Sequence, residues 1–276
     1  MNLNFSSLCD WFVDNKLSIH LGKTESILFG TRRRLNKNGS LNITYNNKLI
    51  KQKTHVKYLG CILDDVLSGN SMANHVLSKV NGKLRFLYRK QHFFNKATRR
   101  LICNALIQPH FDYACSSWYP LLTQGLKNKI QVSQNKCIRY CLKLDNRDHI
   151  GISEFKKINW LPVKKRVEQS ISGTIFKFFK EKVPVYLEHM FQIKNQIHNT
   201  RRSTFSLNIP LCKTLYGQKA ISYMAPKIWD KIPAKIKSGL NINTFKHTIK
   251  KWFFETEQTR ESSDYFYYGE AKCLMV

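Results

Sequence analysis

The spacing of apolar residues predicts two kinds of structure along the chain. From Ser6 to Lys16 apolar residues fall at helical intervals, which predicts a short helix. The alternation from Leu17 to Phe29 predicts two strands around a tight link. Asn46-Asn47 separates two short apolar runs and predicts a two-residue β-hairpin, because asparagine tolerates positive φ. A further strand is expected from His55 to Leu63.

A helical period begins after Ser71. One face of the first helix carries Val76, Val80, Leu84 and Leu87. Pro109 stands near the start of another helix, where its missing N–H costs nothing. Further helices are expected over residues 97–107, 126–144, 163–182, 184–190, 225–229 and 245–254, with an irregular stretch at 192–219.

These patterns predict an α+β protein, with a small antiparallel sheet followed by mostly helical structure. The last 22 residues hold five acids against one arginine and one lysine, which predicts a mobile acidic tail. The expected divisions are residues 1–65 with the sheet, a helical domain at 66–190, a C-terminal segment at 191–256 and the tail at 257–276.

The charge of the chain points to a polyanionic partner. Lys and Arg number 46 against 18 Asp and Glu, a net charge of +28. Residues 66–144 carry thirteen cations and one acid, Asp112. A merely solvated helical surface would mix both signs, so this ratio favours binding to the phosphates of RNA, DNA or an RNA:DNA hybrid over a role in solubility alone.

Composition indicates in which compartment the protein is expected and whether it is expected to bind a metal. Hydrophobic residues make up 42% of the chain, too many for a disordered tail. No segment is apolar enough to span a membrane, and Asp10 and Asp14 make the N-terminus unlike a signal peptide, so we expect a soluble nuclear or cytoplasmic protein with reduced cysteines. Cys137 and Cys141 form a candidate zinc pair with His149, but no fourth ligand follows at a recognisable interval, and buried apolar packing is the favoured interpretation.

Tyr58-Leu59-Gly60, followed by Leu63-Asp64 and a basic helix, resembles part of a known family. The resemblance is to the C-terminal half of a reverse transcriptase from a non-LTR, LINE-type retrotransposon of the jockey kind, and it covers about residues 6–254. Upstream motifs similar to the end of the palm are Trp11, Leu17-Ser18-Ile19, Lys23-Thr24-Glu25 and Phe29. Motifs similar to the thumb and the region after it are Pro109 to Tyr113 with Trp118, Gln134 to Cys137, and Leu161-Pro162-Val163 with Arg166. Motifs similar to the terminal segment are Pro184, Tyr186-Leu187, Trp229, Ile232-Pro233 and Phe245-Lys246.

The resemblance implies a fragment of an RNA-directed DNA polymerase. In the family, two metal ions held by palm aspartates, one set in an aromatic-x-Asp-Asp hairpin, drive nucleotide addition, and the chain contains no such hairpin upstream of the primer grip. We therefore expect a truncated reading frame or gene-model fragment that is inactive alone, binds no cofactor itself and would need the missing polymerase half and its Mg²⁺.

The resemblance also assigns roles to residues. Tyr58, Leu59 and Gly60 would belong to the primer grip, and Lys23 would lie near the leaving pyrophosphate, where an ammonium can act as a general acid. His20 departs from the asparagine common three residues before that lysine. The residues expected to contact phosphates from the thumb are Lys79, Lys83, Arg85, Arg89, Lys90, Arg99 and Arg100.

Other assignments compete with these. Asp64-Asp65 could hold Mg²⁺, but a charged pair that ends a strand is the preferred interpretation, and no metal site is assigned. The tryptophans Trp118, Trp160, Trp229 and Trp252 could stack bases, although aromatics at helical spacing more often fill cores. One alternative function is a free-standing, non-enzymatic module for nucleic-acid binding or assembly. Another is a metal-dependent enzyme using Asp64, Asp65, His55 and His75.

Overall fold

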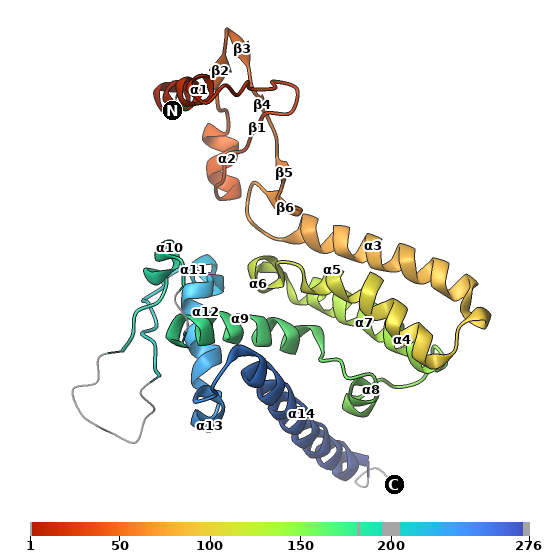
Figure 1. The fold of residues 1–276 in the computed structure, drawn as a ribbon. Helices are drawn as coiled ribbons and strands as arrows, with labels where there is room; N and C mark the ends of the chain where they lie inside the picture. The colour runs from red at the N-terminus through yellow and green to blue at the C-terminus, as the bar shows by residue number, and fades with distance from the viewer. Residues whose placement is uncertain (1, 181–182, 195–204, 273–276) are drawn as a thin grey trace. The chain divides into compact units, whose positions relative to one another are not determined.

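A computed structural model, which describes residues 2–180, 183–194 and 205–272, divides the chain into two compact units, Met1–His75 and Val76–Val276. Helices dominate the described residues, and the strands belong to small two-stranded sheets (Figure 1). The fold is therefore α+β, as the residue pattern predicts. No helix in the described ranges combines the length and apolar character needed to cross a bilayer.

Unit 1 contains short elements. They are α1 (Asn2–Asp14), β1 (Glu25–Ser26), α2 (Arg32–Asn38), β2 (Thr44–Tyr45), β3 (Lys48–Leu49), β4 (Lys51–Gln52), β5 (His55–Tyr58) and β6 (Cys61–Asp64). β1 pairs with β4 in parallel, while β2–β3 and β5–β6 are antiparallel hairpins. Among the described side chains up to residue 65, Ile50 is the one buried apolar residue, at 3% exposure. The described side chains before residue 66 therefore form very little apolar core.

Two expectations for unit 1 need correction. The alternation from Leu17 to Phe29 gives one short strand, β1, instead of two, because residues 17–21 do not pair as a strand. The expected tight link is present, since the N–H groups of Lys23 and Thr24 both donate to the carbonyl of His20 and close a turn. The segment from His55 to Leu63 is not one strand but the β5–β6 hairpin, with φ of 44° at Leu59 and 85° at Gly60. Positive φ at both turn residues matches the twist of the flanking strands, so the chain reverses at this point. The hairpin at Asn46-Asn47 is confirmed, with φ of 49° and 60°.

Unit 2 is helical. α3 (Asn70–Arg89) begins in unit 1 and ends in unit 2. The next elements are η1 (Gln91–Phe93), α4 (Lys96–Leu106), α5 (Gln108–Asp112), α6 (Cys115–Trp118), η2 (Tyr119–Leu121) and α7 (Gln124–Leu142). They are followed by α8 (Ile152–Lys157), α9 (Val163–Lys180), α10 (Val185–Glu188), α11 (Leu215–Lys219), α12 (Ile221–Asp230), α13 (Ala234–Lys237) and α14 (Ile242–Lys272).

The predicted core face of α3 is confirmed. Val76, Val80, Leu84 and Leu87 are each at most 4% exposed. A second part of the core lies between α9, α12 and α14, where the rings of Phe176 and Phe245 stack at 4.5 Å. The predicted position of Pro109 in the first turn of α5 is also confirmed.

Two polar clamps join segments that lie far apart in the sequence. The Arg166 guanidinium forms a two-point ion pair with the Asp112 carboxylate and ties α9 to α5. The buried amide of Gln134 donates to the Leu161 carbonyl at 3.0 Å and accepts from the Val163 N–H at 3.1 Å. A buried amide that satisfies two backbone groups fixes the loop entering α9 against α7.

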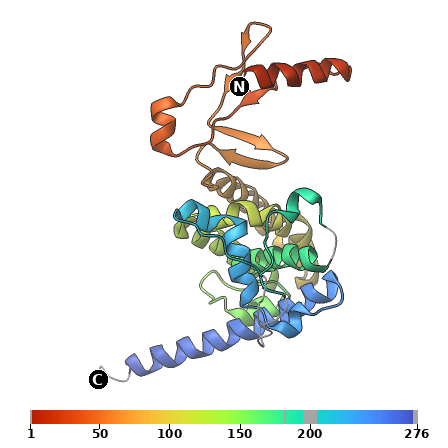
Figure 2. The same ribbon diagram turned by 90° about the vertical axis from the view of Figure 1, so that its left-hand side faces the viewer.

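The acidic C-terminal segment is helical in the described residues. α14 continues through residues 257–272, where a mobile tail is expected from the sequence, and Figure 2 shows it extending beyond the other helices of unit 2. The Glu257 carboxylate pairs with Lys165 of α9 at 3.2 Å. A cluster of acidic residues predicts a tail, but glutamate is also a good helix former, and here the helix has already begun with a buried face that includes Phe245 and Ile249.

Candidate nucleic-acid interface

Arg99 is not a phosphate contact, contrary to the sequence prediction. Its side chain is only 4% exposed, and its guanidinium donates to the carbonyls of Phe94 and Tyr140 at 3.1 Å and to that of Gln91. It also lies 4.8 Å from the centre of the Tyr140 ring. The Tyr140 carbonyl belongs to the last turn of α7, where intrahelical donors are lacking, so Arg99 caps that helix.

Three other cations of residues 66–144 also serve the fold. The Lys83 ammonium donates to the Leu106 carbonyl at the end of α4, at 2.8 Å. The Arg139 guanidinium donates twice to the Asp148 carbonyl, at 2.7 and 3.1 Å. Lys127 is half-buried, and burial, followed by the charges of Lys219 and Lys164, lowers its pKa. Lys83 was predicted to contact phosphates, and its hydrogen bond to α4 competes with that role.

Nine cations of the segment remain exposed. They are Lys79, Arg85, Arg89, Lys90, Lys96, Arg100, Lys129, Lys136 and Lys143. Within the described part of the chain, none of the nine forms an ion pair with a carboxylate. The one acid of the segment, Asp112, is occupied by Arg166. The surface of α3, α4 and α7 therefore presents positive charge that the protein itself does not neutralise.

A groove of about 330 Å³ runs between α3 and α7. Leu77 and Asn81 of α3 face Val132 and Lys136 of α7 across it. The Ser133 hydroxyl and the Asn81 amide oxygen, 3.1 Å apart, hold its floor together.

The basic rim of this groove comes from both helices. Lys129 and Lys136 of α7 line the groove. They are two helical turns apart, about 10 Å along the axis. Arg85 is exposed one turn after Asn81 and so continues the α3 side of the groove. A nucleic-acid strand carries one charge per about 3.4 Å of axis, so this rim spans several phosphates.

Lys129 and Lys136 belong to the thirteen cations of residues 66–144, but they are not among the residues predicted from the sequence to contact phosphates. Their seven-residue spacing places them on one face of α7, and that signal was available. What the spacing could not supply was which face of α7 points outward beside α3. The hydrogen bond from the Tyr88 hydroxyl to the Lys136 carbonyl, at 3.2 Å, shows that this part of α7 lies next to α3.

The three lysines of α3 that are predicted to contact phosphates, Lys79, Lys83 and Lys90, are only partly available. Lys79 and Lys90 are exposed and share a face with Phe86, which is 59% exposed. The Lys90 ammonium lies 5.9 Å from the centre of the Phe93 ring, and that ring is 69% exposed. Exposed aromatic rings among cations are a combination that suits stacking of unpaired bases.

The tryptophans are mostly core residues. Trp118, Trp160 and Trp229 are at most 4% exposed, so their rings are not available for stacking on bases, and Trp252 is half-buried. Cys137 and Cys141 are buried as the packing interpretation expects, at no more than 1% exposure, and burial raises the pKa of the Cys137 thiol. His149 is exposed.

The acidic pair after β6 is bound by the protein. The Asp64 carboxylate is 7% exposed and accepts from the Ser68 N–H at 2.7 Å, the Ser68 hydroxyl at 3.0 Å and the Gly69 N–H at 3.1 Å. Asp65 lies 3.5 Å from the Arg32 guanidinium. In the described residues, no group of three metal-ligating side chains comes together, so Asp64, Asp65, His55 and His75 do not form a site there. Asp64 instead holds the loop that leads into α3.

The residues assigned to polymerase roles lie on the surface of unit 1. Tyr58 and Leu59, at 63% and 76% exposure, form the tip of the β5–β6 hairpin with Gly60. Lys23 is exposed in the turn that begins at His20. Comparison with protein-family models, curated proteins and solved structures finds no match to the chain.

Proposed function

We propose that unit 2 binds nucleic acid through its phosphates, without reading base sequence. The observation that carries this proposal is the set of nine exposed cations on and around α3, α4 and α7, none of which forms an ion pair with a carboxylate in the described residues. Phosphate contacts position a strand but carry no sequence information. Their strength comes largely from release of condensed counterions, so binding falls steeply as salt rises.

The groove between α3 and α7 is the proposed centre of this surface. Its rim supplies Arg85, Lys129 and Lys136, and its lining includes the apolar side chains of Leu77 and Val132. Lys79, Arg89, Lys90 and Arg100 would extend the surface along α3 and α4. Single strands and RNA:DNA hybrids are the expected ligands.

The resemblance to a LINE-type reverse transcriptase gives this binding a biological setting. On that hypothesis residues 66–190 are the thumb-like domain of an RNA-directed DNA polymerase, residues 191–256 are its C-terminal segment, and the tip at Tyr58, Leu59 and Gly60 is its primer grip. Lys23 would then serve near the leaving pyrophosphate. The exposure of the hairpin tip and of Lys23 supports contacts to a ligand, and the polymerase assignment depends on the sequence motifs.

A triple variant of the groove tests the proposal. Arg85, Lys129 and Lys136 are changed together to Gln, and binding of a fluorescent single-stranded RNA is followed by anisotropy at several salt concentrations. Each phosphate contact adds about 0.7 to the slope of log K against log salt for single strands, so the slope should flatten by about 2. Exposed residues contribute little to stability, so the fold should persist.

The matched control removes the same charge elsewhere. Lys213, Lys231 and Lys235 are exposed and lie outside residues 66–144. Their triple change to Gln should leave the salt slope close to that of the unmodified protein. Equal flattening in both triple variants would show that total charge, and not the groove, determines binding.

A further inference from the structure

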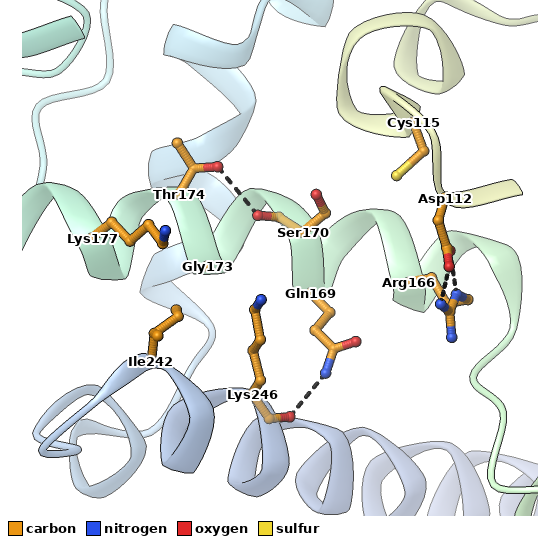
Figure 3. A pocket seen from close by; sticks show the side chains of 10 residues that line it. All are labelled: Asp112, Cys115, Arg166, Gln169, Ser170, Gly173, Thr174, Lys177, Ile242 and Lys246. Carbon is orange, nitrogen blue, oxygen red and sulfur yellow. Dashed lines mark hydrogen bonds and ion pairs between the residues drawn. The ribbon is translucent and has the colours of Figure 1, made fainter. Parts of the chain in front are cut away.

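A second cavity, of about 480 Å³, lies between α9 and α14 (Figure 3). Small-molecule sites have volumes of about 300–1,000 Å³, so this cavity is large enough for a small ligand. The residues that line it are Asp112, Cys115, Arg166, Gln169, Ser170, Gly173, Thr174, Lys177, Ile242 and Lys246. None of them belongs to the α3–α7 groove.

One face of α9 supplies most of the lining. Arg166, Ser170, Gly173 and Lys177 recur at intervals of three and four residues and therefore share that face. A β-carbon at Gly173 would make ordinary van der Waals contacts with Ile242 Cδ1 at 3.8 Å and Lys246 Cε at 3.9 Å, so the glycine borders a space that only a side chain larger than a methyl group would occupy. A larger side chain would fill the space between the two helices. Figure 3 shows the Lys246 side chain rising from α14 toward α9 at this level.

The cavity is rich in positive charge, because Lys177 and Lys246 are exposed cations on opposite helices. The Thr174 hydroxyl already donates to the Ser170 carbonyl at 3.3 Å, and the Gln169 amide donates one N–H to the Lys246 carbonyl at 2.8 Å. The Ser170 hydroxyl also lines the cavity. The one carboxylate in the lining, that of Asp112, is held by Arg166. An incoming anion would therefore meet two ammonium groups, and the carboxylate among the lining residues is the one already paired with Arg166.

Burial, followed by the charge of Asp112, raises the pKa of Cys115 to about 11. The Cys115 side chain is thus a neutral thiol at pH 7, and the cavity has no activated nucleophile among its lining residues.

We propose that this cavity binds the phosphate group of a small phosphorylated molecule of nucleotide size. Lys177 and Lys246 would hold the phosphate oxygens from two sides, and the Ser170 hydroxyl would add a neutral hydrogen bond. The phosphate could also be the phosphorylated end of a nucleic-acid strand, which presents the same chemistry. This site is separate from the groove, and the proposal does not depend on the function proposed for it.

Calorimetric titration of the full chain with inorganic pyrophosphate tests the proposal. We expect saturable binding at one site per chain. Changing Lys177 and Lys246 together to Gln should weaken binding at least tenfold, because two charged contacts are lost. The matched control changes Lys235 and Lys251, exposed lysines outside the cavity, to Gln and should stay within twofold of the unmodified protein.

Two further variants make the result specific. Gly173→Leu keeps every charge but fills the cavity and should also abolish binding, provided its helical circular dichroism and thermal transition are retained. The groove variant with Arg85, Lys129 and Lys136 changed to Gln should bind pyrophosphate normally. Absence of saturable binding, or equal weakening in the Lys235/Lys251 control, would overturn the proposal.

Competition in the groove variant distinguishes the two sources of phosphate. If the ligand is a strand end, a 5′-phosphorylated oligonucleotide should displace pyrophosphate and its 5′-hydroxyl counterpart should not. If the ligand is a free small molecule, a nucleoside diphosphate should displace pyrophosphate and both oligonucleotides should fail to do so. Displacement by both oligonucleotides equally would contradict recognition of a phosphate end.

Discussion

The substitution Arg99→Met tests whether Arg99 stabilises the fold of unit 2 or binds nucleic acid. In the structure the Arg99 guanidinium is buried, donates to three backbone carbonyls and lies over the Tyr140 ring. Methionine keeps the hydrophobic stem and removes every donor. The Gln91 carbonyl can recover water because residue 91 is exposed, whereas the Tyr140 carbonyl belongs to a residue that is 1% exposed.

The expected loss follows from these contacts. A buried carbonyl without a donor costs about 1–3 kcal/mol, and loss of a desolvated cation–π contact costs up to about 2 kcal/mol. The Phe94 carbonyl, on a half-buried residue, adds a smaller amount. The total is about 3–5 kcal/mol, a large fraction of the stability of a typical domain. For a unit of this size, a loss near 4 kcal/mol lowers Tm by roughly 8–16 °C.

The neighbouring residue gives a matched control. Arg100→Met makes the same chemical change on an exposed position of the same helix and should alter the free energy of unfolding by less than about 0.5 kcal/mol. Urea unfolding followed by circular dichroism at 222 nm measures both. At a temperature where each variant is folded, Arg100→Met should weaken nucleic-acid binding and Arg99→Met should not. A stable Arg99→Met variant with weakened binding would refute the assignment of Arg99 to the fold.

Three more outcomes are expected. Burial raises the pKa of the Cys115 thiol to about 11, so the stability that this thiol contributes is complete below the ordinary cysteine pKa and is lost as pH rises from about 9 to 11. Cys115→Ala should therefore reduce the alkaline loss of unfolding free energy by about 2–3 kcal/mol. If the unfolding free energies of the two proteins, measured with urea, fall by the same amount across that range, the prediction is wrong. In hydrogen exchange, residues 17–63 should exchange faster than 76–142, because the described side chains before residue 66 form little apolar core and the two-stranded sheets there leave edges unpaired; the reverse order would refute it. In primer extension on poly(rA)/oligo(dT) with Mg²⁺ or Mn²⁺, the chain should show no activity, since the sequence contains no aromatic-x-Asp-Asp hairpin, and template-dependent extension would contradict the fragment hypothesis.

The residue pattern predicts elements well where packing follows periodicity. Val76, Val80, Leu84 and Leu87 are spaced for one buried face, and burial of that face is what the structure shows. The hairpin at Asn46-Asn47 is likewise readable because asparagine tolerates the φ values it needs. The hairpin at Leu59-Gly60 is harder to predict, since leucine rarely adopts positive φ, although Gly60 beside it is a residue that favours turns.

For the candidate site, the sequence predicts the excess of positive charge but not which of the cations lie together on the surface. The ratio of cations to acids in residues 66–144 indicates a phosphate-binding region, but it treats every cation alike. Arg99 and Lys83 differ from Arg85 only in what lies opposite them, namely backbone carbonyls brought close by α4 and α7. Such contacts depend on the three-dimensional arrangement of helices, and no spacing within one helix reveals them.

The contacts made by the motifs that carry the family resemblance also depend on the three-dimensional arrangement of the helices. Pro109 to Tyr113 and Arg166 are far apart in sequence, and so are Gln134 and Leu161. The structure joins each pair through the Asp112–Arg166 ion pair and the Gln134–Leu161 hydrogen bond. These residues hold the helical unit together, which gives a structural reason for them whatever the unit binds.

The salt dependence of nucleic-acid binding by the unmodified chain tests the central claim most directly. If about half of the nine exposed cations reach phosphates, log K against log salt should be linear with a slope of about −3 to −4, with nearly the same affinity for single-stranded RNAs of different sequence. Fluorescence anisotropy from low to physiological salt measures both quantities. An affinity that does not change with salt, or a strong preference for one sequence, would contradict binding through phosphates.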